Sequence, residues 1–306
     1  MTFAWGLRGA ACAFALALAW TMITSWGGRP GPATGADTAG TPGAAWVLGR
    51  PGAPVPDQTY CVALDPKGQW LGEGVRDGTV RVWDRRTRAM AYRWPCHADV
   101  VTALAFAPDR PALLTTGRDG AVRLWSLGGD APALTAEASC DDLPAAAAFA
   151  PDGRTLAVGT GAAVWLWRVA GHRLLPWDKR PTYGHKVQAL AFAPGGAELA
   201  AGGAGDNAVR LWRLNGAGAP AVAVGGTPFQ VRGLAFSPDG RTLWTAYTLG
   251  RVVATDLTGG GCREGQLNGP DCRQVAFAPD GRYVLVAHFD GTARLRPLPG
   301  ELWEGD

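Results

Sequence analysis

The sequence has few of the residues from which catalytic centres are built. Its 306 residues include four histidines and four serines, and they contain no HExxH, GxSxG, P-loop or paired CxxC motif. The sequence therefore gives no support for a hydrolase, kinase or zinc finger of the classes that carry those motifs. The net charge of +3 offers little electrostatic attraction for nucleic acid. We expect no catalytic residue, no metal, no cofactor and no nucleic-acid partner.

Glycine and proline, in contrast, are abundant. The chain has 44 Gly and 23 Pro, together about a fifth of its residues and well above ordinary usage. Both residues interrupt helices, which argues against a helix bundle and against a doubly wound α/β sheet. An apolar content of 47% is too high for a disordered chain. The composition favours a fold with many short, tight turns.

The first 28 residues form a candidate membrane segment. Residues 9–28 carry no charge, and a helix of that length spans about 30 Å, the thickness of one hydrocarbon core. Trp5 and Trp26 lie near the two ends, where indole rings favour the interface. We predict one hydrophobic helix that acts as a signal anchor. A cleaved signal peptide is the main alternative, although its small-x-small triplet at 17–19 lies inside the apolar run, and a plain hydrophobic tail is the third.

A tether is predicted between this segment and a folded domain. Residues 29–45 are mostly Gly, Pro, Ala and Thr, so they cannot offset the entropy cost of ordering, and the domain is expected at 46–306. Positive charge at Arg8 favours a cytoplasmic start, which places the domain on the non-cytoplasmic side of the membrane. Cleavage would instead give a secreted or periplasmic protein, and the sequence leaves this choice open.

An internal repeat organises the chain from residue 46 onward. A segment resembling Ala-Phe-Ala-Pro-Asp-Gly recurs six times at intervals of 41 to 44 residues. Such even spacing predicts six copies of one structural unit of about 43 residues. The units are centred on Leu64, Phe106, Phe149, Phe192, Phe236 and Phe277.

Each unit is predicted to contain four strands. Side chains alternate with a period of two before the central residue, with small residues on one face and large residues on the other. Pro-Asp-Gly turns follow at 151–153, 238–240 and 279–281. Second strands are expected at 155–159, 242–247 and 283–288, third strands at 79–83 and 121–125, and fourth strands at 88–94 and 219–224. Six units of four strands predict an all-β protein built of blades around an axis.

The third strands carry a motif that resembles the WD-repeat (Trp-Asp repeat) β-propeller family. The matching strings are DGTVRVWD at 77–84, DGAVRLWS at 119–126 and DNAVRLWR at 206–213, and Gly184-His185 is similar to the family's Gly-His. The resemblance covers about residues 46–300 and agrees with the period and order of the motifs. It implies a six-bladed propeller of four-stranded antiparallel blades.

The resemblance also implies a polar network within the blades, joining a His, a Ser or Thr, an Asp and a Trp. Blade two is predicted to be complete, with His97, Thr116, Asp119 and Trp125. The partial sets are Asp77 and Trp83 with Glu73 at the hydroxyl position in blade one, Trp167 in blade three, His185, Asp206 and Trp212 with Ala201 in blade four, Leu249 and Thr255 in blade five, and Asp290 with Arg296 in blade six. Because the set recurs at one repeat phase, we predict a structural role for it and not a catalytic one.

Either end of the domain can close the ring. The apolar segment 46–50 precedes the first unit and is favoured as the fourth strand of blade six, pairing near residues 292–296. The alternative is the C-terminal segment 301–303. Either solution removes two open sheet edges, which would otherwise promote aggregation.

The six cysteines leave a disulfide undecided. They are Cys12, Cys61, Cys96, Cys140, Cys262 and Cys272. Cys262 and Cys272 are near enough in sequence to pair across one loop in an oxidising compartment, and free thiols are the equal alternative.

The loops around one mouth of the ring are the predicted binding positions, because they are held by rigid strands. By resemblance to the family, the residue before each turn Asp faces this mouth, which selects Arg76, Arg118, Gly205 and Phe289, and Lys186 should lie on the same rim. Two arginines on neighbouring blades can hold a carboxylate or phosphate. The alternative is that these arginines are merely solvated.

These features predict a noncatalytic, membrane-tethered scaffold that presents a rigid ring to unidentified protein partners, and a monomer is favoured over an oligomer. A secreted propeller of the periplasmic TolB type is one alternative. Another is the sensory or substrate-binding module of an enzyme system whose catalytic part is on another chain. Clustered Asp, Glu or His in the central channel would favour catalysis, whereas an apolar or arginine-lined rim would favour binding.

Overall fold

The computed structural model describes residues 46–48, 57–161, 163–182, 186–205, 207–214, 221–224, 229–259, 261–267, 271–278 and 282–297. The chain divides into two units, Met1–Thr34 and Gly35–Asp306, and every described residue belongs to the second. The predicted anchor at 9–28 and tether at 29–45 lie outside the described residues. In the part of the chain that is described, no helix has the length and apolar character needed to cross a membrane.

Blades one to three follow one another along the chain, each as a four-stranded antiparallel sheet. Blade one contains β2 (Thr59–Leu64), β3 (Trp70–Val75), β4 (Thr79–Asp84) and β5 (Met90–Pro95). Blade two contains β6 (Val101–Phe106), β7 (Ala112–Gly117), β8 (Ala121–Ser126) and β9 (Ala133–Ser139). Blade three contains β10 (Ala146–Phe149), β11 (Thr155–Gly159), β12 (Ala163–Ala170) and β13 (Arg173–Pro181).

Blades four to six repeat the same order. Blade four contains β14 (Lys186–Phe192), β15 (Glu198–Ala204), β16 (Val209–Arg213) and β17 (Ala221–Val224). Blade five contains β18 (Val231–Phe236), β19 (Thr242–Tyr247), β20 (Arg251–Asp256) and β21 (Gly261–Gln266). Blade six contains β22 (Cys272–Phe277), β23 (Tyr283–His288), β24 (Ala293–Pro297) and β1 (Trp46–Leu48).

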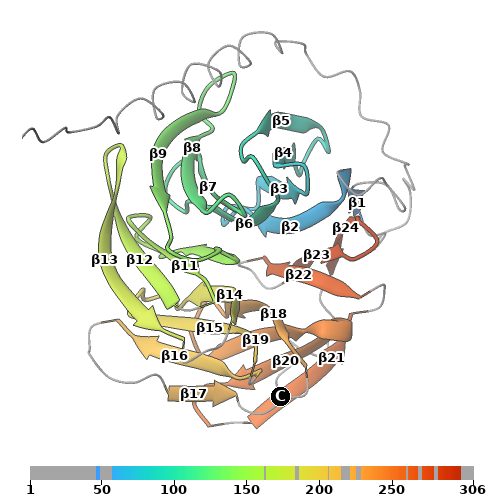
Figure 1. Ribbon diagram of the computed structural model, residues 1–306. Helices are drawn as coiled ribbons and strands as arrows, with labels where there is room; N and C mark the ends of the chain where they lie inside the picture. Colours follow the sequence, from blue (N-terminus) through green and yellow to red (C-terminus); the bar gives the residue numbers. More distant parts are fainter. Residues whose placement is uncertain are drawn as a thin grey trace, which may run out of the picture. The chain divides into compact units, whose positions relative to one another are not determined.

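The first strand of each blade lies innermost, so the six sheets form a ring (Figure 1). Each inner strand contacts the inner strand of the next blade, and the series closes where β22 meets β2. All six central apolar residues identified from the repeat, Leu64 to Phe277, are the last residues of these inner strands. The predicted six-bladed all-β propeller is therefore confirmed.

The repeated turns explain why the strand boundaries were predictable. The expected second strands 155–159, 242–247 and 283–288 coincide with β11, β19 and β23. Gly153 and Gly240 end two of the Pro-Asp-Gly turns with φ of 64° and 72°, a left-handed conformation that glycine adopts without strain. The third such turn, at 279–281, lies outside the described residues. The fourth strand of blade one begins at Met90, later than expected, because Arg88 has a positive φ of 58° in the turn before it.

The N-terminal strand closes the ring, as the sequence favoured. β1 pairs antiparallel with β24 in the register Trp46 to Leu295, Val47 to Arg294 and Leu48 to Ala293. In Figure 1, β1 at the blue end of the chain lies beside β24 at the red end. Leu48 is buried against the core between blades six and one. The alternative closing segment, 301–303, lies outside the described residues.

Blades pack on one another through small residues on their second strands. A Cβ added to Gly74 would lie 2.7 Å from Cγ1 of Val101, which begins the inner strand of the next blade. A Cβ on Gly159 would lie 2.3 Å from Cγ1 of Val187, at the equivalent point between blades three and four. Glycine at these positions lets adjacent sheets approach closely and bury their aliphatic faces.

Candidate functional site

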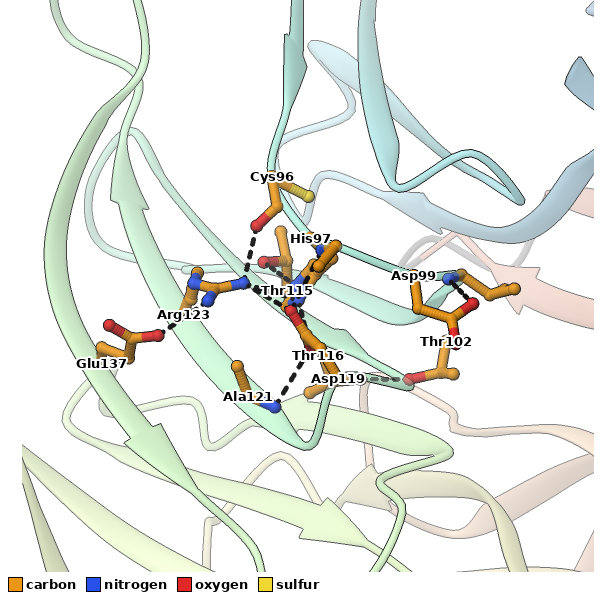
Figure 2. A network of polar contacts seen from close by, with 12 residues as sticks. Cys96, His97, Asp99, Thr102, Thr115, Thr116, Asp119, Ala121, Arg123 and Glu137 are labelled. Carbon is orange, nitrogen blue, oxygen red and sulfur yellow. Dashed lines mark hydrogen bonds and ion pairs between the residues drawn. The ribbon is translucent and has the colours of Figure 1, made fainter. Parts of the chain in front are cut away.

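In blade two, a polar network joins a threonine, a histidine and a carboxylate (Figure 2), and a tryptophan extends it. The indole Nε1 of Trp125 donates to Thr115 Oγ1 at 3.0 Å, and the Thr115 hydroxyl lies 2.8 Å from His97 Nε2. His97 Nδ1 is 2.9 Å from Asp119 Oδ1. Because an indole can only donate, the hydroxyl hydrogen is free to point at Nε2, which leaves the hydrogen on Nδ1 to be donated to Asp119. Arg123 Nη1 also lies 2.9 Å from Nδ1, and its two hydrogens have acceptors in Cys96 O and Asp119 Oδ2. With its single ring hydrogen on Nδ1, the His97 imidazole is neutral.

The predicted place of Thr116 in this network is wrong. Its hydroxyl lies 2.9 Å from that of Thr102 on the inner strand, and Thr115 supplies the network hydroxyl. Adjacent residues of a strand point to opposite faces of the sheet, so only one of two consecutive threonines can face His97. His97, Asp119 and Trp125 are joined as predicted.

Charged groups in blade two are paired. Asp119 Oδ2 accepts from Arg123 Nη1 at 2.9 Å, and Arg123 Nη2 lies 2.8 Å from Glu137. Burial lowers the pKa of His97, with the nearby guanidinium of Arg123 acting in the same direction and Asp119 opposing it. Burial alone would raise the pKa of the Asp119 carboxyl, but His97 and Arg123 outweigh it and hold the pKa below its ordinary value.

Blade one has a carboxylate where blade two has the network hydroxyl. Glu73 occupies the position that Thr115 has in blade two, and its side chain is fully buried. Trp83 Nε1 donates to Glu73 Oε2 at 3.3 Å, Arg81 Nη1 lies 3.5 Å from Oε1, and the hydroxyl of Thr59 donates to Oε1. Arg81 also pairs with Asp57. Glu73 therefore replaces the hydroxyl and the histidine together.

The remaining predicted network residues serve their own blades. Asp77 accepts from the backbone N–H of Thr79 at 2.8 Å, and Asp290 accepts from Thr292 and from Arg294 at 2.9 Å. Trp167 and Trp212 are buried between blades, whereas His185 and Asp206 lie outside the described residues. In the described blades, therefore, Asp77 and Asp290 hold turns and the two tryptophans fill the core, which is a structural use.

A β-bulge near the start of the inner strand recurs in five blades. The strand pairing skips one residue there, and an extra residue of this kind redirects its side chain. The bulged residues are Tyr60, Thr102, Gln188, Arg232 and Arg273. Each stands four residues before the central apolar residue of its unit. None of them is predicted from the sequence as a site residue. The sequence feature that marks them is a polar side chain at the same position of each repeat, in a strand that is otherwise apolar.

Arginine and aromatic side chains from blades five, six, one and two meet at the mouth of the ring where the inner strands begin. The guanidinium carbons of Arg76, Arg118 and Arg273 lie 5.8, 5.6 and 4.6 Å from the centroid of the Tyr60 ring. Those of Arg273 and Arg232 lie 4.3 and 5.9 Å from the Phe289 ring. We call this set the mouth cluster: Tyr60, Arg76, Arg118, Arg232, Arg273 and Phe289.

Three of the five predicted rim residues belong to the mouth cluster, and Gly205 and Lys186 do not. Arg76, Arg118 and Phe289 are brought together, and Arg118 Nη2 is 3.5 Å from the Tyr60 hydroxyl. Lys186 begins β14 at the same mouth, but among the described residues it makes no ion pair, hydrogen bond or ring contact with the cluster. The role of these residues in binding stays a prediction.

The arginines of the mouth cluster lack acidic partners within the described residues. None of the four forms an ion pair with a described carboxylate, although other arginines of the chain do. Burial lowers the pKa of Arg273, and the charges of Arg76 and Arg232 lower it further while Tyr60 opposes them. Burial likewise lowers the pKa of Arg232. Because a guanidinium keeps its proton in proteins, the cluster is a concentration of like charge.

A central channel of about 350 Å3 runs between the inner strands. Its described lining is almost entirely aliphatic and aromatic, with Gln188, Gln274 and Arg232 as the polar side chains. It includes no Asp, Glu or His among the described residues, and no group of three or more His, Cys, Asp or Glu in the described chain is placed to hold a metal ion. The described channel lining is thus largely apolar, and its rim carries arginines.

The cysteines of the described chain are free thiols, so the pairing of Cys262 with Cys272 is not formed. Cys262 is exposed on β21, the outermost strand of blade five, whereas Cys272 is buried at the start of β22, an innermost strand. Burial raises the pKa of Cys96 to about 12, which leaves that thiol protonated and unreactive.

Comparison with known proteins defines the class. The family described as WD domain, G-beta repeat matches residues 53–84, 89–126, 178–213 and 261–296. With six four-stranded blades and the network of blade two, this match shows that the chain belongs to the WD40-repeat β-propeller family.

Individual relatives share parts of this chain. Coronin-7 from Bos taurus is 34% identical over 116 residues, which are 37% of this chain and 13% of that protein. Human coronin-7 is 34% identical over 118 residues, 37% of this chain and 12% of its own length. The chain thus spans about an eighth of these relatives. A chain in the crystal structure of the mitotic checkpoint complex superimposes with a TM-score of 0.62 at 20% identity, covering 78% of this chain and 75% of that one, which shows a common fold.

Proposed function

We propose that this propeller is a noncatalytic scaffold that binds a partner protein at the mouth where the inner strands begin. The observation that carries the proposal is the contrast between the channel and its rim. The described channel lining holds no Asp, Glu or His, whereas the rim gathers four arginines around two aromatic rings, with Phe289 46% exposed. Aromatic residues and arginines are the side chains that most often dominate protein interfaces.

The scaffold presents this rim rigidly. Arg232 and Arg273 are held by bulges in paired strands, and Arg76 and Arg118 stand directly after β3 and β7. Side chains on such a frame lose little conformational freedom when a partner binds. Membership of the WD40-repeat family supports the proposal, because propellers of this family bind proteins.

Site-specific photocrosslinking tests the proposal. A benzoylphenylalanine in place of Phe289 should give discrete adducts with a partner protein in cells, and the purified partner should then bind the full chain directly. The matched control places the same group at Arg213, an exposed residue on β16 at the opposite end of the blades. Equal adducts at both positions, or no direct binding by the purified partner, would contradict binding at the mouth.

We also propose that residues 9–28 tether the propeller to a membrane, with the domain on the non-cytoplasmic side. Twenty uncharged residues after Arg8 support this proposal. N-terminal sequencing of the protein recovered from carbonate-washed membranes should begin at Met1 or Thr2. A start after residue 28 in a soluble fraction would instead indicate a secreted or periplasmic protein.

A further inference from the structure

We propose that the mouth cluster binds an acidic segment of the partner protein, whose Asp and Glu carboxylates meet the arginines of blades five, six, one and two. This inference rests on the proposed function and adds the chemistry of the segment that is bound. It follows from how the four guanidinium groups are spread, from their lack of internal partners and from their confinement to one side of the mouth.

The arginines are distributed over two rings. Arg273 contacts both, at 4.6 Å from Tyr60 and 4.3 Å from Phe289. Arg76 and Arg118 lie beside the Tyr60 ring, and Arg232 contacts only the Phe289 ring. A single phosphate is best held by groups that point at one centre, whereas cations distributed over two rings suit several carboxylates along an extended segment.

No described carboxylate forms an ion pair with these four arginines. Asp77 accepts from Thr79 N, and Asp119 and Asp290 pair with Arg123 and Arg294. Asp271, two residues before Arg273, is exposed and forms no ion pair among the described residues. The half-buried guanidinium groups of Arg232 and Arg273 are therefore desolvated beside like charges. Groups in this state gain most from an anion that arrives from outside.

The cluster occupies one side of the mouth. At the positions equivalent to Tyr60, Arg232 and Arg273, blades three and four carry Ala145 and Gln188, which are uncharged. Phe289 offers an exposed ring beside Arg273, on which an apolar residue of the same segment can pack. The segment is thus expected to carry two or more carboxylates close to one apolar side chain and to cross blades five, six, one and two.

Defined peptides test the inference on the full chain in mild detergent. The probe is a fluorescein-labelled twelve-residue peptide with four Glu and one Phe. The control, called the amide peptide, has Gln in place of each Glu. Fluorescence anisotropy should show that the acidic peptide binds at least about tenfold more tightly than the amide peptide, because hydrogen bonds to charged groups contribute more than neutral ones. Binding should weaken as the salt concentration rises.

Variants locate the binding. Arg273→Gln should weaken the acidic peptide about tenfold or more, and Arg213→Gln, at the opposite end of the blades, should leave it unchanged. Arg118→Gln is the second variant, because Arg118 is exposed and its replacement does not threaten folding. Equal binding of acidic and amide peptides, or equal binding by wild type and both mouth variants, would overturn the inference.

Two further probes separate the outcomes. Preferential binding of a singly phosphorylated peptide, or of a single-stranded oligonucleotide, over the acidic peptide would overturn the choice of carboxylates.

A displayed library of random peptides then distinguishes this inference from the proposed function. Uncharged peptides whose binding is lost in Phe289→Asp but kept in Arg273→Gln would retain the mouth as a protein-binding site and reject the acidic segment, whereas no mouth-dependent peptide of any charge would reject both.

Discussion

Two polar regions of the propeller use the same residue types in opposite ways. Inside blades one and two, Arg81 and Arg123 each contact two described carboxylates, and His97 is held by Thr115 and Asp119. At the mouth, four arginines contact only aromatic rings and neutral polar groups of the described chain. Charges that are paired inside a blade cost stability when one partner is removed, whereas charges without described acidic partners on a rigid frame are suited to a ligand.

The largest effect is expected in blade one. Glu73→Ala removes a fully buried carboxylate, which leaves Trp83 and Thr59 without their acceptor and takes one of two carboxylates from Arg81. The free energy of unfolding should fall by about 4 kcal/mol, measured by urea unfolding. Glu198→Ala is the control, because its pair with Arg213 is exposed and should change stability by less than about 0.5 kcal/mol. Similar losses of unfolding free energy in both variants would contradict a large contribution of the Glu73 network to stability.

Neighbouring threonines in blade two sharpen the comparison. Thr115→Val removes the acceptor of Trp125 and the partner of His97, so it should lower the free energy of unfolding by about 2 kcal/mol. Thr116→Val loses one hydrogen bond, to Thr102, and should lower it by about 1 kcal/mol. A larger loss in Thr116→Val would contradict the assignment of the network hydroxyl.

The pH dependence of stability should report the neutral state of His97. Burial lowers the pKa of His97 in the fold, while an unfolded histidine titrates near 6.5. The unfolded chain therefore binds more protons as the pH falls below about 6.5, and stability is present above that pH and is lost as the pH decreases. His97→Gln should flatten this slope between pH 7 and 5 in urea unfolding. The exposed His172 provides the control, and an equal change in His172→Gln would contradict the origin of the slope.

The mouth cluster should contribute least to stability. Arg273→Gln removes favourable contacts with two rings and also the repulsion from Arg76 and Arg232. These effects oppose each other, so the free energy of unfolding should stay within about 0.5 kcal/mol of wild type. A loss as large as that of Glu73→Ala would mean that these arginines hold the fold.

The ring and its strands could be predicted because turn residues recur at a fixed phase. Pro-Asp-Gly sets the end of one strand and the start of the next, which is why β11, β19 and β23 agree with the expected ranges. The choice between residues 46–50 and 301–303 as the closing strand depended on pairing with β24, which periodicity does not specify.

The candidate site was only partly predictable, for two physical reasons. Thr115 and Thr116 are chemically identical, and the sheet register alone decides which one faces His97. Arg232 and Arg273 follow apolar strand positions, and a bulge turns their side chains to the mouth. Arg76 and Arg118 were found because they precede a turn that the family motif marks.

The central claim is that the mouth arginines serve a ligand and the blade networks serve the fold. Isothermal titration of the acidic peptide into wild type and the double variant Arg76→Gln/Arg273→Gln, with urea unfolding on the same samples, tests it most directly. The account predicts an affinity loss of at least about tenfold, equivalent to about 1.4 kcal/mol, with the free energy of unfolding unchanged within about 0.5 kcal/mol. Unchanged affinity, or affinity and stability falling together, would contradict it.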